Sequence, residues 1–245
     1  MKLRFDGVIS EDGGFADIWL AYDATERKVA VKIVRESSVE ISDALAHARA
    51  LVRAAHKNIV TVFAVTDVED PGRPGTYAPA IIMEYLSGET LYDAMLSRKF
   101  SDMEVLKISI GLIDAVRHIH KSGLVHGDLH EKNIMLVAGE VKVIDLLYRY
   151  SLLSVDSAKN AELQRREVDS VSRLIAELAT KSSLDPSLIA TFMRNEQKSQ
   201  SLDMLASAVW QLCGAPIVAP SLTSLSLSVI LCARHSMTIR SIYAK

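Results

Sequence analysis

The sequence has little cysteine and almost no net charge, and each shortage excludes a class of protein. Cys213 and Cys232 are the only cysteines in 245 residues, too few for a disulfide framework and without the spacing of a metal site. We therefore expect a reducing, cytoplasmic setting. The 28 basic and 30 acidic residues leave a net charge of -2, so we expect no nucleic-acid partner.

The chain also lacks a good membrane segment. Residues 1–6 contain no apolar core of a signal peptide. The apolar stretch 217–233 is interrupted by Pro220 and rich in serine and threonine, so it is a poor candidate for a span, and we expect no membrane attachment. Nearly half of the residues are apolar and a quarter are charged, which predicts a globular protein. Nothing in the sequence indicates its oligomeric state.

The first third of the chain is dominated by strand patterns. Gly13 and Gly14 separate two strand-like pieces and predict a hairpin within residues 8–22. A polar, proline- and glycine-rich stretch at 71–75 predicts an exposed loop between two later strands. The expected elements are strands at 28–34, 59–66 and 80–85 and an amphipathic helix at 39–55.

After Ser87 and Gly88 the pattern changes to helices. Apolar residues recur at helical spacing in 91–98, 102–122, 162–180 and 202–212, and Asp185-Pro186 predicts the start of one more helix. We expect an α+β protein with a β-rich N-terminal part at 1–86, a helical part at 87–213 and a tail of uncertain structure at 214–245.

One polar stretch stands out in the helical part. His126-Gly127-Asp128-Leu129-His130-Glu131-Lys132-Asn133 is followed by the apolar run 134–137, and Asp145 ends the next apolar run. A hard cation prefers oxygen ligands, and a hydroxyl that attacks phosphorus needs a base. Asp128, Asn133 and Asp145 together therefore predict a site for Mg²⁺ and a phosphate donor.

These motifs, in this order, resemble the protein kinase-like superfamily, as a compact, divergent serine/threonine protein kinase domain. The resemblance covers residues 7–212. Ala30-Val31-Lys32 is similar to the family's phosphate-binding strand, and Met83-Glu84-Tyr85-Leu86 to the hinge whose backbone binds adenine. The resemblance implies a two-lobe fold, with ATP and Mg²⁺ as cofactors and a protein as substrate.

The resemblance also implies roles for single residues. Lys32 would neutralise the α- and β-phosphates, Asp128 would be the catalytic base, and Asn133 and Asp145 would hold Mg²⁺. Asp169 is similar to the buried aspartate that holds the catalytic loop from below. His126 would pack and hydrogen-bond rather than do chemistry. The expected cofactor-binding residues are Gly13, Gly14, Ile18, Ala30, Lys32, Met83, Glu84 and Leu86.

The nucleotide site departs from the family pattern. The three usual glycine positions of the phosphate loop read Glu11, Gly13 and Ala16, which predicts weaker ATP binding. The helix glutamate expected to pair with Lys32 is replaced by His47, and Asp43, one turn earlier, is a plausible substitute.

The catalytic region departs as well. Gly127 stands where many protein kinases have arginine, and His130 where serine/threonine kinases usually carry lysine. The metal motif reads Asp145-Leu146-Leu147, without a glycine hinge, and the chain from Asp145 to Asp169 is too short for a full activation segment.

Three functions stay open on these residues. The first is a minimal serine/threonine protein kinase, favoured by the four retained polar residues of the site. The second is a weak or inactive pseudokinase that binds nucleotides or partners, favoured by the lost glycines and helix glutamate. The third is a small-molecule kinase of the aminoglycoside or choline kinase type, favoured by the motif Gly127-Asp128-Leu129-His130.

Overall fold

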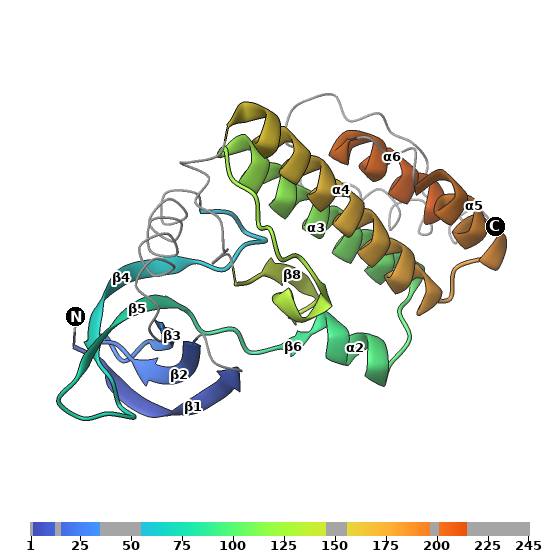
Figure 1. Cartoon of the computed structure of the whole chain (residues 1–245). Helices are drawn as coiled ribbons and strands as arrows, with labels where there is room; N and C mark the ends of the chain where they lie inside the picture. Colours follow the sequence, from blue (N-terminus) through green and yellow to red (C-terminus); the bar gives the residue numbers. More distant parts are fainter. Residues whose placement is uncertain (1, 13–15, 35–54, 146–155, 197–200, 215–245) are drawn as a thin grey trace, which may run out of the picture. The chain divides into compact units, whose positions relative to one another are not determined.

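The computed structural model describes residues 2–12, 16–34, 55–145, 156–196 and 201–214, and Figure 1 shows their path. The strands are β1 (Arg4–Asp12), β2 (Ala16–Tyr22), β3 (Lys28–Val34), β4 (Val62–Glu69), β5 (Tyr77–Glu84), β6 (Glu89–Thr90), β7 (Ile134–Val137) and β8 (Glu140–Val143). The helices are α2 (Leu91–Ser97), α3 (Asp102–Lys121), the short 3₁₀ helix η1 (Glu131–Asn133), α4 (Ser157–Thr180), α5 (Pro186–Glu196) and α6 (Leu202–Leu212).

The N-terminal strands form one antiparallel sheet in the order β1-β2-β3-β5-β4. One face of β3 carries Val29, Val31 and Ile33, which join the buried hydrophobic cluster with residues of β2, β4 and β5. Because side chains alternate along a strand, Ala30 and Lys32 lie on the opposite face. β3 is therefore anchored through one face, and Lys32 lies on the other.

The helical part is built around α3. Ser101 and Glu104 form a capping box at its start, where the Ser101 hydroxyl accepts from the Glu104 N–H and the Glu104 carboxylate accepts from the Ser101 N–H. Its buried residues recur at helical spacing and include Val105, Leu112 and Val116. The helix packs against β8, α4 and α6, which makes it the centre of this core.

A second sheet of three strands, β6-β7-β8, supports the polar stretch identified in the sequence. Residue 88 must be glycine, because a Cβ atom there would lie 2.2 Å from the carbonyl oxygen of Leu136. This close approach lets β6 pair with β7 directly after the connection between the two parts of the chain.

The segment before β4 joins the two sheets. Ile59 forms a parallel bridge with Val143 at the end of β8. The Val143 N–H donates to the Asn58 carbonyl at 2.8 Å, and the Val60 N–H donates to the Val143 carbonyl at 2.9 Å. Residues 58–60 therefore pair with β8 of the β7–β8 hairpin and are not part of β4.

Most expected elements agree with the structure, and the α+β organisation is confirmed. The strand expected at 59–66 is wrong at its start, because Ile59 and Val60 pair with β8 and β4 begins at Val62. The helix expected from 162 begins five residues earlier at Ser157, where Asp156 caps it. The loop at 71–75 is exposed except for the half-buried Pro71.

Other expectations are untested. The helix at 39–55 lies outside the described residues except for Ala55, and so does the tail after Gly214. Residues 1–214 form one compact unit, so the boundary at residue 86 stays a prediction. No helix in the described ranges is long and apolar enough to cross a lipid bilayer.

Candidate active site

The loop that carries Asp128 is held from inside by His126. This histidine is fully buried, and its Nε2 lies 2.8 Å from the Ile144 carbonyl, while its Nδ1 lies 3.3 Å from the Asp128 N–H. A neutral ring that donates through Nε2 and accepts through Nδ1 satisfies both contacts. His126 therefore has a packing and hydrogen-bonding environment, while the Asp128 side chain is 70% exposed and open to a substrate.

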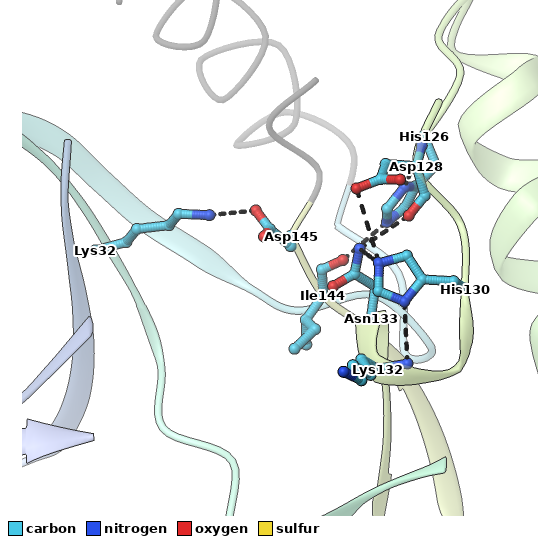
Figure 2. Close-up of polar contacts among 8 residues, drawn as sticks. All are labelled: Lys32, His126, Asp128, His130, Lys132, Asn133, Ile144 and Asp145. Carbon is cyan, nitrogen blue, oxygen red and sulfur yellow. Dashed lines mark hydrogen bonds and ion pairs between the residues drawn. The ribbon is translucent and has the colours of Figure 1, made fainter. Parts of the chain in front are cut away.

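Asn133 ends η1 and is oriented by two neighbours. Its Nδ2 donates to the Asp128 carbonyl at 2.8 Å and lies 3.0 Å from Nε2 of His130 (Figure 2). The first contact uses one amide hydrogen, whereas the roles in the second depend on the tautomer of His130, whose Nδ1 accepts from the Lys132 N–H. Oδ1 is the atom that Asn133 can offer to a cation. The side chain is the right kind of ligand for Mg²⁺, which is bound through oxygen.

Asp145 follows β8 and is held through its neighbour Ile144. The Ile144 N–H donates to the Asn133 carbonyl at 2.9 Å, so Asn133 and Asp145 are linked by backbone hydrogen bonding. Asp145 itself has a positive φ of 58°, an uncommon conformation for an aspartate. Its Oδ1 forms an ion pair with Lys32 (Figure 2).

Lys32 lies on β3 of the N-terminal sheet and reaches Asp145 from there. Its side chain is only 14% exposed, and a lysine that buried requires a partner for its charge. The two partners expected on the helix, Asp43 and His47, lie outside the described residues. The partner that the structure gives is Asp145, from a position 113 residues later.

The expected adenine-side residues share one face of the sheet. Ile18 is the cross-strand partner of Lys32, and Ala30 is the partner of Met83. Cross-strand partners point to the same side, so these four side chains lie opposite the hydrophobic cluster formed by Val31 and its neighbours.

Of the remaining expected cofactor residues, Glu84 and Leu86 lie within the described ranges. Glu84 ends β5 and Leu86 lies in the connection that follows, both half-buried. Gly13 and Gly14 lie outside the described residues, so their contribution to a phosphate loop stays a prediction.

The expectation for Asp169 is wrong, because this residue is exposed on α4. Glu167, two positions earlier, is only 4% exposed and accepts a hydrogen bond from the Gly127 N–H at 2.8 Å. Its other oxygen lies 2.7 Å from Nε2 of His120 on α3. Glu167 therefore holds the loop from below, next to a glycine with a φ of 81°.

Helical spacing in the sequence contains the signal for Glu167. The buried positions Val171, Leu174 and Leu178 are spaced four, three and four residues apart from Glu167 onward. An acidic residue in phase with an apolar stripe faces the core, whereas Asp169 is about 200° away around the helix.

The described residues fit a magnesium site completed by phosphate oxygens rather than one made by protein alone. They contain no group of three or more histidines, cysteines or acidic residues that could hold a metal. Asn133 and Asp145 would supply two oxygen ligands, and Asp145 is paired with the cation Lys32. Mg²⁺ is commonly bound by one or two such residues together with substrate phosphates.

Comparison with known proteins agrees with a site for phosphate transfer. Residues 11–149 match the family model described as "Protein kinase domain". The chain is 34% identical over 143 residues to a probable serine/threonine-protein kinase of Streptomyces coelicolor, covering 57% of this chain and 21% of that protein. It is 33% identical over 146 residues to the serine/threonine-protein kinase PksC of the same organism, covering 55% of this chain and 26% of PksC.

A mycobacterial protein gives a similar result. The serine/threonine-protein kinase PknG of Mycolicibacterium smegmatis is 31% identical over 139 residues, which cover 55% of this chain and 18% of PknG. The chain thus matches only about a quarter or less of the length of these relatives. The β-rich part followed by a helical part agrees with the two-lobe kinase fold. The chain belongs to the protein kinase family.

Proposed function

We propose that this chain is an ATP- and Mg²⁺-dependent phosphotransferase that acts on serine or threonine hydroxyls of a protein. The observation that carries the proposal is a chain of contacts: Asn133 bonds to the carbonyl of the exposed Asp128, its own carbonyl accepts from the residue before Asp145, and Asp145 pairs with Lys32. A cation, two oxygen ligands and an accessible carboxylate are the groups that phosphoryl transfer requires.

Each residue would have one task. Asp128 would accept the proton of the hydroxyl as its oxygen bonds to the γ-phosphorus and the bond to the β–γ bridging oxygen breaks, with that electron pair leaving on ADP. Lys32 would balance charge on the α- and β-phosphates. Asn133 Oδ1 and the Asp145 carboxylate would hold Mg²⁺, which when bound offsets the charge of the phosphates.

A protein substrate is supported by the names of the relatives, all of which describe serine/threonine-protein kinases. The expected short stretch between Asp145 and α4 would leave little chain for docking a long peptide. The substrate would therefore be recognised mainly close to Asp128. A cytoplasmic location stays a prediction from the cysteine content.

The pseudokinase alternative is favoured by the ion pair between Lys32 and Asp145. In this contact one carboxylate oxygen of Asp145, an expected Mg²⁺ ligand, neutralises Lys32, which is expected to bind the phosphates. ATP and Mg²⁺ would have to exchange with it, which predicts slow or weak turnover. The small-molecule alternative is favoured by His130, whose ring lies 3.7 Å from Asp128.

Phosphate transfer separates these functions. The protein would be incubated with γ-labelled ATP, Mg²⁺ and a generic protein substrate, next to Asp128→Ala and Asp145→Ala. Asp67→Ala, an exposed aspartate on β4, is the matched control. We expect wild type and Asp67→Ala to label protein, and both site variants to lose at least about 100-fold in rate.

Two other results would replace the proposal. ATP binding without any transfer by the wild type would identify a pseudokinase. Labelling of added amino alcohols or sugars but never of protein would identify a small-molecule kinase.

A further inference from the structure

Glu84 at the end of β5 makes contacts that its expected role does not use. Its Oε1 accepts from the Thr61 N–H at 2.7 Å and from Lys142 Nζ at 2.6 Å. The two charged side chains are 25% and 17% exposed. The side chains of a surface ion pair would be more exposed to solvent. The Glu84–Lys142 pair is therefore half-buried, and it connects β5 with β8.

The contact with Thr61 fixes the backbone of Glu84. The Glu84 N–H donates to the Thr61 carbonyl at 2.9 Å, while the Thr61 N–H donates to the Glu84 side chain. Residue 84 is therefore bound to residue 61 through both its main chain and its side chain. This reciprocal pair restricts rotation of the peptide that begins the connection at 85–88.

The contact with Lys142 extends this restraint to the strand that leads to Asp145. Lys142 lies on β8, three residues before Asp145, and its Nζ is also 3.5 Å from the Ile59 carbonyl. The next residue, Val143, is bonded through its backbone to Asn58 and Val60. The Lys142 charge thus joins three segments, namely β5, residues 58–61 and β8.

Electrostatics keeps the pair together. Burial alone would raise the pKa of the Glu84 carboxyl, but the hydrogen bonds from Lys142 and Thr61 outweigh that effect and hold this pKa below its ordinary value. Glu84 is therefore ionised at neutral pH and retains a charged partner across the connection.

We propose that Glu84 and Lys142 are positioning residues for the nucleotide, setting the distance between its adenine end and its phosphate end. The inference rests on the proposed function, in which the backbone of 84–86 binds adenine and Asp145 holds Mg²⁺. Neither charged group touches the nucleotide. They act by fixing the end of β5 relative to the strand that leads to Asp145.

The test compares ligands with and without adenine. Affinity for MgATP and for magnesium tripolyphosphate would be measured by calorimetry, together with KM and kcat, for Lys142→Met, Glu84→Gln and wild type. Lys107→Met is the matched control, because Lys107 forms a 2.7 Å ion pair with Glu140, which lies on β8 as Lys142 does. Both side chains of this control pair are more exposed than those of Lys142 and Glu84. Lys142→Arg is the variant that keeps the charge.

We expect Lys142→Met and Glu84→Gln to bind MgATP about 10-fold more weakly, because binding would then have to order the end of β5, which the ion pair holds in place in the wild type. Tripolyphosphate affinity should change less than twofold, since it contacts only the phosphate end. KM for ATP should rise with kcat nearly unchanged, and Lys142→Arg should restore most of the affinity. The control Lys107→Met should match wild type.

The outcomes that overturn the inference differ from those that overturn the proposed function. If wild type binds MgATP and both variants bind it within twofold of wild type, the positioning role is wrong. If both ligands weaken equally, the pair is only structural. A wild type that binds no MgATP overturns the proposed function, and the inference with it. Lys142→Met decides the result if Glu84→Gln does not fold.

Discussion

Glu167 is the buried group whose loss should lower both the stability of the protein and its catalytic rate. Its two oxygens bind the Gly127 N–H at 2.8 Å and His120 Nε2 at 2.7 Å, and the side chain is 4% exposed. Gly127 directly precedes Asp128. The change Glu167→Ala therefore removes the support of the loop from below and takes the carboxylate away from the Gly127 N–H and from His120 Nε2.

The cost follows from these two contacts. Hydrogen bonds to a charged group contribute about 1.5–3 kcal/mol each, so the alanine variant should lose about 3 kcal/mol of unfolding free energy. In a domain of about this size, 1 kcal/mol shifts Tm by roughly 2–4 °C, which predicts a decrease of about 6–12 °C. A displacement of Asp128 by about 1 Å would lower kcat by on the order of 100-fold.

The assay is thermal unfolding together with phosphate transfer at saturating ATP. Asp169→Ala is the control, because Asp169 is exposed two positions away on the same helix. Glu167→Gln should lie between wild type and Glu167→Ala, since its carbonyl can still accept from Gly127. KM for ATP should stay within about twofold of wild type, because the loop lies on the catalytic side of the proposed site. Equal damage by Asp169→Ala, or an unchanged kcat in Glu167→Ala, would refute this role.

The remaining predictions concern pH and reactivity. Burial and the neighbouring His118 ring, stacked at 4.8 Å, hold the pKa of His56 below its ordinary 6.5, although Asp114 acts in the other direction. The unfolded chain therefore binds this proton more readily, so unfolding free energy should fall as pH decreases from about 7 to about 5, and His56→Gln should reduce that slope in denaturant titrations. Burial also raises the pKa of the Cys213 thiol to about 12, so peptide mapping after iodoacetamide at pH 8 should find it unmodified in the folded protein and modified in denaturant.

The sequence predicted the elements that carry the candidate site because their signals are local. The apolar run around Lys32 predicts a strand at 28–34, and β3 has these same bounds. The separation of Asp128 from Asn133 by one short loop is also a property of the chain itself. Side chains five residues apart on a tight turn must lie close together, which is why the contact of Asn133 with the Asp128 carbonyl could be expected.

The errors arise where distant segments compete. Ile59 and Val60 have the pattern of a strand that continues into β4, yet they pair with Val143 of β8. The family resemblance points to Asp169 by residue type, whereas the phase of the apolar stripe on α4 favours Glu167. Local pattern identifies a strand or a helix face, but it does not state which partner that surface meets.

The sequence by itself thus determined the α+β order of elements, the protein kinase resemblance and the residues that are proposed to react. Those properties depend on periodicity and on residues close in the chain. Only the tertiary structure decided that Lys32 pairs with Asp145, that Glu167 holds Gly127 and that Lys142 joins Glu84. The physical reason is that Lys32, Glu167 and Lys142 are each largely removed from water, and such a charge needs a polar partner that packing brings to it, however distant in sequence.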